Sequence, residues 1–290
     1  MRIGFWMGIL VLLLITITFA GCVDEKGGAG DGGATTINIA GSSTVFPIAQ
    51  QCAEAFNEQH EDIYVQVEAP PSGSGGGIRA LGTGIADIAD SSRSIKEEEI
   101  AEYPNVEFVD HVIALDGVAI IVSKAIYEAG VTELTSDEVR RIYLPSDDPD
   151  KITNWKDVGG PDEGISVNER EEGSGTRATF MEKIFGDAGA STGATQSWNA
   201  NADVKTAVAN ANNAIGYVGL GYVDSNTPCV MLDGVEAKKE TIASGEYPLS
   251  RSLHMYTNGE PEGAIAEFLE FVLSPAGQSI VENEGFLRVN

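Results

Sequence analysis

Short apolar runs alternate with helical patterns along the chain from residue 36 onward. Residues 36–40 form the first run, and apolar side chains then recur at helical spacing at Val45, Ala49, Cys52 and Phe56. Strands that alternate with helices in this way predict an α/β fold with parallel strands. Ligands of such folds bind beyond the carboxyl ends of the strands, so the loops that leave these ends are the first candidates for a site.

The later runs predict the rest of the fold. Residues 63–68 alternate between two faces, as a half-buried strand does. We further expect strands at 87–89, 165–167, 230–232 and 252–256, and helices at 136–143, 202–211, 264–273 and 274–284.

The apolar run from residue 106 to residue 122 is longer than an ordinary strand of about 5–6 residues. We predict two strand halves with a kink at Asp116-Gly117, which suits a crossing from one lobe to another. A buried two-stranded hairpin is the alternative. The run at 214–223 is a candidate for a second crossing.

Four predicted strands end in loops rich in glycine and hydroxyl side chains. One reads Arg-Glu-Glu-Gly-Ser-Gly-Thr-Arg at 170–177 and opens a helical pattern. Its glycines let backbone amides approach one point, the helix N-terminus adds about half a positive charge, and Arg170 adds a fork of donors. Such a loop suits a small oxyanion, although a capped helix after a flexible turn is the alternative. The other three loops lie at 41–47, 70–77 and 90–93.

Several common phosphate-binding and catalytic motifs are absent from these loops. Gly73 and Gly75 are followed by Ile78 where a dinucleotide fingerprint needs a third glycine, and the Gly-Lys-Ser/Thr of a P-loop does not occur. Ser74 and Ser174 lack the Gly-x-Ser-x-Gly spacing of a hydrolase, although a triad assembled in space with one of the three histidines stays an alternative. No Cys-x-x-Cys or His-x-x-x-His spacing supports a metal site, so we expect neither a metal nor a cofactor.

The chain is strongly acidic, with a formal net charge of -26. This excludes nucleic acid as a partner, because a phosphate backbone needs a basic face. A small anion remains a possible ligand, because salt screens the distant negative charges of the surface over about 8–10 Å and the site itself is built from local amides and arginines.

Residues 1–21 predict a secretory signal, which together with Cys22 is not part of the fold. A basic start at Arg2 precedes an apolar stretch at 8–19, and Phe19-Ala20-Gly21-Cys22 ends it in small residues. This end resembles a lipoprotein signal, in which Cys22 becomes the lipidated first residue; an uncleaved anchor helix is the alternative. Cleavage after residue 21 removes one base and no acid, which leaves 44 acidic against 17 basic residues, or -27. Residues 22–35 then form a lipidated, Gly-rich tether.

Two further cysteines, Cys52 and Cys229, remain in the body of the chain. They could pair in an oxidising compartment. Two buried free thiols are the alternative, and the sequence leaves the choice open.

The ordered set of loops resembles the phosphate-binding proteins of ABC importers, which belong to the periplasmic-binding-protein class. The resemblance covers about residues 36–290. Its motifs are Gly-Ser-Ser-Thr-Val-Phe-Pro at 41–47, Gly-Ser-Gly-Gly-Gly at 73–77, Ala-Asp-Ser-Ser-Arg at 89–93, Arg-Glu-Glu-Gly-Ser-Gly-Thr-Arg at 170–177 and Ile-Gly-Tyr-Val-Gly at 215–219.

The resemblance implies a two-lobed α/β fold of type II, in which each lobe is a mixed sheet flanked by helices. The ligand then lies in a cleft between the lobes. Lobe 1 is expected to comprise residues 36–116 and 224–290, and lobe 2 residues 117–223. Closure on the ligand is expected, with hinges near 113–120 and 214–223.

The same resemblance implies which residues bind phosphate. From lobe 1 these are Ser43, Thr44, the amide of Val45, Ser74 and Ser92, and from lobe 2 they are Arg170, Ser174, Gly175 and Thr176. Well-known members carry an aspartate where this chain has Ser92, and that aspartate accepts the proton of phosphate. Asp116 is the first candidate for this role and Asp90 the second, and we expect Asp116→Asn to weaken the discrimination against sulfate. Arg93 and Arg177 are candidates for contact with the anion or for support of its loops.

The function implied is that of an extracytoplasmic solute-binding protein, not an enzyme. It is expected to be a monomer, lipid-anchored on the outer face of the cell membrane, that captures inorganic phosphate and delivers it to an ABC permease. Alternatives are the same fold with sulfate, molybdate or tungstate as ligand, a serine hydrolase, or a structural or adhesive lipoprotein with an empty cleft.

Overall fold

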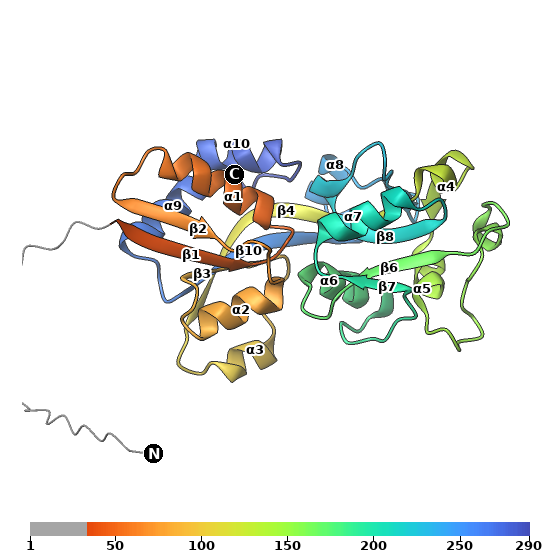
Figure 1. The fold of residues 1–290 in the computed structure, drawn as a ribbon, viewed down its shortest axis with the longest axis horizontal. Helices are drawn as coiled ribbons and strands as arrows, with labels where there is room; N and C mark the ends of the chain where they lie inside the picture. The colour runs from red at the N-terminus through yellow and green to blue at the C-terminus, as the bar shows by residue number, and fades with distance from the viewer. Residues whose placement is uncertain (1–33) are drawn as a thin grey trace, which may run out of the picture. The chain divides into compact units, whose positions relative to one another are not determined.

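The computed structural model describes residues 34–290, in which strands and helices alternate (Figure 1). The predicted signal, Cys22 and the Gly-rich stretch at 27–33 lie outside the described residues. The strands are β1 (Thr35–Gly41), β2 (Ile63–Val67), β3 (Ile88–Ser91), β4 (Phe108–Val122), β5 (Glu133–Leu134), β6 (Ser166–Arg170), β7 (Gln196–Trp198), β8 (Ala214–Gly219), β9 (Met231–Leu232) and β10 (Ser250–Asn258). The helices are α1 (Phe46–Asn57), α2 (Ser74–Gly82), α3 (Glu97–Glu102), α4 (Lys124–Glu128), α5 (Ser136–Tyr143), α6 (Gly175–Phe185), α7 (Asn201–Asn210), α8 (Lys239–Ala243), α9 (Gly263–Leu273) and α10 (Pro275–Asn283), with the 3-10 helices η1 (Trp155–Val158) and η2 (Leu220–Tyr222).

One sheet joins most of these strands in the order β2-β1-β3-β10-β4-β8-β6-β7. β1 runs parallel to both β2 and β3, while β10 is antiparallel to β3 and to β4. On the other side of β4, β8 is antiparallel to it, and β6 is parallel to both β8 and β7. The sheet is therefore mixed, with its antiparallel strands at the centre.

β4 runs without interruption from one half of the sheet to the other (Figure 1). Its residues 108–117 pair with β10, and its residues 118–122 pair with β8. The predicted crossing at Asp116-Gly117 thus lies where the strand changes partner. The predicted break into two strands is wrong, as is the alternative of a hairpin. The run at 214–223 is a strand only as far as Gly219, where η2 follows.

Two large hydrophobic clusters mark two lobes. The first contains side chains of β1, β2 and β3 together with α1, α9 and α10, and the second contains the end of β4 with α5, α6 and β8. Val230, Ile242 and Leu249 belong to the second cluster. We therefore infer that lobe 2 extends to about residue 249, because β9 in this connection pairs with β5 of the same lobe.

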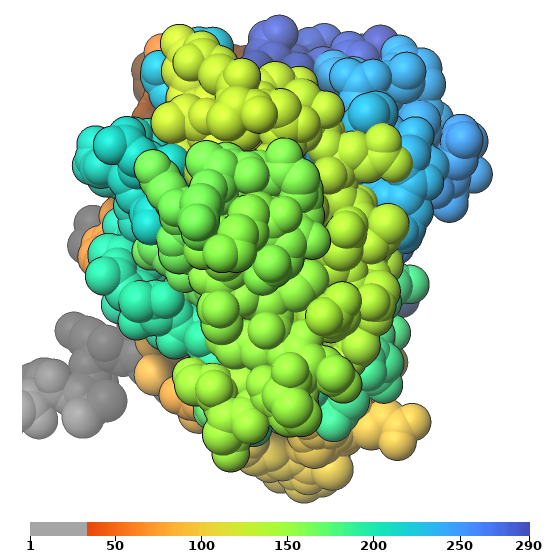
Figure 2. All heavy atoms as spheres, turned by 90° about the vertical axis from the view of Figure 1, so that its right-hand side faces the viewer, coloured from red at the N-terminus to blue at the C-terminus, as the bar shows by residue number. Residues whose placement is uncertain are grey.

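The segment between β4 and β6 covers the end of lobe 2. Figure 2 looks at this end, and the segment forms most of the visible surface in yellow-green and green. Val139, Ile142 and Trp155 of this segment are fully buried in the second cluster. The indole of Trp155 donates to the carbonyl of Asn213 at 2.9 Å, so its one polar group is satisfied.

No single helix in residues 34–290 is both long and apolar enough to cross a membrane. α9 and α10 reach that length and composition only together, across a bend of 60°. Both pack on the first cluster through Phe268, Leu269 and Val281.

The two cysteines of the body are free thiols. Cys52 is fully buried in the first cluster, and Cys229 lies beside the second, with its thiol donating to the carbonyl of Val230 at 3.3 Å. Burial raises the pKa of each thiol to about 12. The structure therefore agrees with the alternative of two free thiols and not with a disulfide between Cys52 and Cys229.

Candidate functional site

The four loops singled out in the sequence meet between the two lobes. Three of them follow β1, β2 and β3, whose parallel arrangement brings their carboxyl ends to one edge of the sheet. The fourth follows β6 of lobe 2. The hydroxyls of Thr44 and Thr176 lie 3.0 Å apart, and the amide of Gly75 donates to the carbonyl of Gly173 at 3.1 Å. Loops that are distant in sequence therefore touch across the cleft.

This close approach depends on a residue without a side chain at position 175. A Cβ atom there would collide with the hydroxyls of Ser74 and Ser92. The neighbouring Gly173 has open space around its Cα, so a Cβ there meets nothing. The geometry therefore requires glycine at 175 for the lobes to come together, and not at 173.

Hydroxyl side chains are concentrated and buried where the loops meet. Each of the following is at most 3% exposed: Ser43, Thr44, Ser74, Ser92, Ser174 and Thr176. Burial of a hydroxyl is costly unless it forms hydrogen bonds. A dense group of them between two lobes therefore indicates a binding site for a polar ligand.

Three helices begin at this group and direct their N-termini toward it. α1 follows Val45, α2 begins at Ser74 and α6 begins at Gly175. Each N-terminus carries unpaired amides and about half a positive charge. Ser174 caps α6, because its hydroxyl accepts from the amide of Arg177 at 3.2 Å, which leaves its own hydrogen free to donate.

Arg170 contributes the cation that the sequence predicted, and it is 1% exposed at the end of β6. Its Nε donates to the carbonyl of Trp198 at 3.2 Å and its Nη2 to that of Asn199 at 2.5 Å. Its Nη1 is buried and has no partner within the described residues. Burial lowers the pKa of this guanidinium to about 10, which still leaves it charged at neutral pH. A buried, unpaired donor of this kind indicates a missing acceptor.

Two residues that the sequence did not reveal also reach the group. Asn201, the first residue of α7, donates through Nδ2 to the hydroxyls of Ser43 at 3.2 Å and Thr44 at 2.8 Å. Arg251 of β10 donates through Nη2 to Thr44 at 3.2 Å and through Nη1 to Thr176 at 3.1 Å. Neither residue stands in a glycine-rich motif, so no local signal marks it.

Asp116 lies at this group but is held by Arg251. Its Oδ2 accepts from Nε and Nη2 of Arg251 at 2.8 and 2.7 Å, and its Oδ1 accepts from the amide of Leu220 at 2.9 Å. Burial raises the pKa of Asp116, and Arg251 works against this rise. Both carboxylate oxygens are thus occupied by donors from the protein.

The other two arginines of the predicted site are engaged with carboxylates. Arg93 forms two hydrogen bonds with Glu99, at 2.7 and 2.6 Å. Arg177 lies with its Nε 3.5 Å from Glu169 and donates through Nη2 to the carbonyl of Ala190 at 3.3 Å. Their guanidinium groups therefore support the loops.

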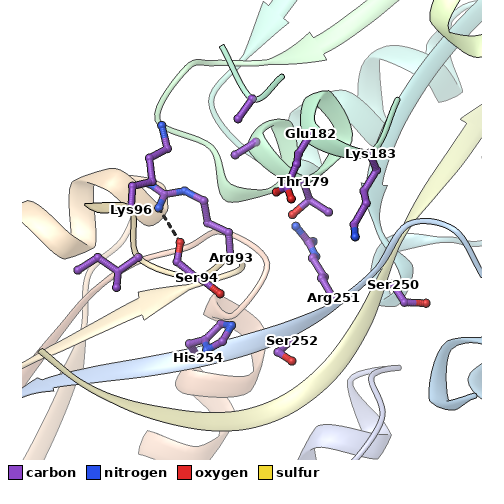
Figure 3. Close-up of a pocket in the computed structure, with 13 residues that line it drawn as sticks. Arg93, Ser94, Lys96, Thr179, Glu182, Lys183, Ser250, Arg251, Ser252 and His254 are labelled. Atoms are coloured by element: carbon purple, nitrogen blue, oxygen red, sulfur yellow. Dashed lines mark hydrogen bonds between the residues drawn. The ribbon is translucent and has the colours of Figure 1, made fainter. Parts of the chain in front are cut away.

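A cavity of about 430 Å³ opens between the lobes beside this group (Figure 3). Arg93, Arg251 and His254 line it from lobe 1, and Thr179 and Lys183 line it from α6 of lobe 2. In Figure 3 the side chain of Arg251 points from its strand toward α6. Since Arg251 also reaches the buried hydroxyls, the cavity lies next to the group of donors.

The histidine, cysteine and acidic side chains of residues 34–290 bear on two other kinds of site. No group of three His, Cys, Asp or Glu side chains is placed to hold a metal ion there. His254 pairs with Asp110 at 2.7 Å and His111 with Thr257 at 3.0 Å, and within the described residues neither histidine forms a hydrogen bond with Ser74 or Ser174.

Comparison with known proteins agrees with this geometry. The family described as the PBP superfamily domain matches residues 27–276. The chain is 32% identical to the phosphate-binding protein PstS of Bacillus subtilis over 97% of this chain and 94% of that protein. It is 30% identical to PstS of Borreliella burgdorferi over 97% of this chain and 98% of that protein.

Solved structures show the same fold. A structure from Clostridium perfringens, described as a phosphate ABC transporter substrate-binding protein with bound phosphate, is 34% identical, with a TM-score of 0.79 over 88% of this chain and 100% of that chain. An ABC-type phosphate transport receptor from Vibrio cholerae is 31% identical, with a TM-score of 0.69 over 87% of this chain and 99% of that chain. The chain therefore belongs to the periplasmic-binding-protein superfamily, and within it to the family of the PstS phosphate-binding proteins.

Proposed function

We propose that this protein captures inorganic phosphate outside the cytoplasm and delivers it to an ABC-type permease in the membrane. The observation that carries this proposal is the buried Nη1 of Arg170, which has no partner within residues 34–290, beside a cleft where the two lobes bring buried hydroxyls together. Relatives over nearly the full chain are named phosphate-binding proteins, which supports the same ligand. The binding residues are those predicted from the sequence, with Asn201 and Arg251 in addition.

The number of donors is sufficient for tight binding. Micromolar affinity needs only about 8 kcal/mol, and each hydrogen bond to a charged group contributes about 1.5–3 kcal/mol. Six hydroxyls, the amides of three helix N-termini and one free guanidinium nitrogen therefore exceed the requirement. Desolvation of the anion and closure of the lobes offset much of that sum.

Tethering to the membrane forms the second part of the proposal. Cys22 would carry the lipid, and residues up to 35 would connect it to lobe 1. This arrangement keeps a monomeric receptor beside its permease. Replacement of Cys22 by serine is expected to move the protein from the membrane fraction to the soluble fraction without changing its affinity for phosphate.

Sulfate, molybdate and tungstate are the rival ligands, and thermal unfolding with each anion distinguishes them. A ligand at 100 times its dissociation constant adds about 2.7 kcal/mol to the free energy of unfolding. We expect phosphate to raise the melting temperature of the tag-free protein, purified without phosphate, at the lowest concentration of any anion in the panel. The proposal is wrong if molybdate or tungstate stabilises the protein at lower concentration than phosphate, or if no anion shifts the transition.

A further inference from the structure

The motif Ile-Gly-Tyr-Val-Gly at 215–219 supplies none of the donors described above, although it lies beside them. It forms most of β8, in which every residue is buried. β8 lies between β4 and β6 in the sheet (Figure 1), so it adjoins both the crossing strand and the strand that ends in Arg170. The hydroxyl of Tyr217 is the one polar side-chain group of the motif. We therefore expect the motif to act on the site through its neighbours.

Side chains join β6 and β8 near Arg170. Backbone pairing between the two strands ends at Val167 and Ile215. Beyond this point Nδ2 of Asn168 donates to the carbonyl of Ile215 at 3.2 Å. The backbone N–H of Arg170 donates to the hydroxyl of Tyr217 at 3.1 Å. The end of β6 is therefore attached to β8 through the hydroxyl of Tyr217.

The ring of Tyr217 is held in place by aromatic neighbours. It is fully buried and stacks on Phe180 of α6, with 4.1 Å between the ring centroids and 9° between the planes. Tyr143 packs beside it, at 5.7 Å between centroids. Burial raises the pKa of the Tyr217 hydroxyl above its ordinary value, so this group stays neutral at physiological pH. The hydroxyl is thus a fixed acceptor at the end of β6.

The guanidinium of Arg170 is held from the opposite side, by β7 and the residue after it. Arg170 pairs with Trp198 in the sheet, and its Nε and Nη2 donate to the carbonyls of Trp198 and Asn199. Its Nη1 is the nitrogen left without a partner in residues 34–290. The place of Nη1 therefore depends on two attachments, one at the guanidinium and one at the backbone.

Two glycines of the same motif also bring residues of the site together. A Cβ at Gly219 would lie 2.9 Å from Cγ2 of Thr44 and 3.1 Å from Oδ2 of Asp116. A Cβ at Gly216 would lie 2.7 Å from Cγ1 of Val204 in α7, the helix that begins at the group of buried hydroxyls. Each glycine therefore permits a close approach that places residues of the site.

Loss of the Tyr217 hydroxyl would leave the N–H of Arg170 without this partner in a buried place. A buried backbone N–H without a partner is unfavourable, so the end of β6 would move until another acceptor or a water molecule satisfies it. A hydrogen bond from a guanidinium needs a donor–acceptor distance of about 2.7–3.2 Å and a nearly straight angle. A small displacement of this strand end therefore weakens the bond between Nη1 and a bound anion.

We propose that Tyr217 is a positioning residue for anion binding. Its hydroxyl holds the end of β6 so that Nη1 of Arg170 meets the bound anion, while Tyr217 itself does not touch the ligand. This inference rests on the proposed function and adds a residue that acts only through Arg170.

Tyr217→Phe tests the role of the hydroxyl, because the variant keeps the ring and its stacking on Phe180. We expect the Kd for inorganic phosphate, measured by calorimetry in a buffer free of other phosphate, to rise about tenfold. An unchanged Kd in the folded variant overturns the inference.

Tyr143→Phe is the matched control. Tyr143 is also fully buried in this aromatic group, and its hydroxyl donates to the carbonyl of Asn168 at 2.9 Å. Each variant thus loses one buried hydroxyl that bonds to the backbone of β6, and each should lower the midpoint of urea unfolding by about 0.5 M. The Kd of Tyr143→Phe should stay within about twofold of the parent value. A loss of affinity as large as that of Tyr217→Phe would show a general effect of the core and overturn the inference.

The same replacement in a chain that already carries Arg170→Met separates positioning from a structural role. If Tyr217 acts through Arg170, Tyr217→Phe changes the Kd of Arg170→Met by less than about twofold, although it costs about tenfold in the parent chain. An equal loss in both chains overturns the inference, because the hydroxyl then acts by another route. The unmodified protein is titrated first, so an absence of phosphate binding there is a failure of the proposed function, and the inference falls with it.

Discussion

Replacement of Arg170 by methionine tests the site most directly. The change removes the guanidinium but keeps a flexible side chain that fills most of the same space. The Nη1 atom of Arg170 is buried without a partner in residues 34–290, so a bound anion gains from it a charged hydrogen bond. In the variant this bond and the positive charge are both lost.

The expected loss of affinity follows from these contacts. A hydrogen bond to a charged group contributes about 1.5–3 kcal/mol, and truncation of one partner of a buried charge pair costs about 2–5 kcal/mol. We therefore expect phosphate binding by Arg170→Met to weaken by about 3 kcal/mol, which is roughly 100-fold in Kd.

Stability should respond much less than affinity. The carbonyls of Trp198 and Asn199 lose their bonds to Arg170, at a cost of about 1 kcal/mol each. Removal of a buried charge whose Nη1 lacks a partner offsets this cost. The free energy of unfolding without phosphate should thus change by less than about 2 kcal/mol.

Calorimetric titration and urea unfolding, both in phosphate-free buffer, measure the two quantities. Arg177→Met is the matched control, because its guanidinium bonds with Glu169 and the carbonyl of Ala190 and not with the buried hydroxyls. Its Kd should stay within about threefold of the parent value. The placement of the site is refuted if Arg170→Met keeps the parent affinity, or if Arg177→Met loses as much.

Further predictions concern a glycine and a buried acid. Gly175→Ala should abolish phosphate binding with little loss of stability, because the new Cβ collides with hydroxyls of lobe 1. Gly173→Ala is the control, since a Cβ there meets open space and the variant should bind phosphate normally. Calorimetric titration of both variants with phosphate measures the difference. Burial raises the pKa of Asp90, so above about pH 4 the unfolded chain has released a proton that the folded protein keeps. The free energy of unfolding then falls by up to about 1.4 kcal/mol per pH unit until the folded-state pKa is reached. Asp90→Asn should remove this contribution, and identical pH slopes of variant and parent in urea titrations would contradict it.

The binding loops could be predicted because their signals are local. A strand, a short stretch of glycines and hydroxyls, and the start of a helix follow one another within about ten residues at 170–177, and the same order occurs after β1. Each signal depends on the residues themselves, since glycine permits close approach and serine caps the helix that follows.

Asn201 and Arg251 could not be predicted in the same way. Arg251 lies on a strand of ordinary appearance, and its role arises from Asp116, which is 135 residues away in sequence. The unbroken path of β4 was missed because its length exceeds that of common strands. The placement of Val230 and Leu249 in the second cluster depends on pairing between β5 and β9, which have only two residues each. Pairing between short strands that are distant in sequence produces no periodic pattern of apolar residues from which it could be predicted.

The continuity of β4 constrains how the two lobes can separate. β4 is hydrogen-bonded in both halves of the sheet, so any separation of the two lobes that preserves their hydrophobic clusters must bend this strand. The bend falls at the one place where it exchanges neighbours, between Gly117 and Val118. Asp116 lies next to this point and bonds with Arg251, which also donates to Thr44 and Thr176. A bend of β4 there therefore also displaces the side chains that join the buried hydroxyls of the two lobes.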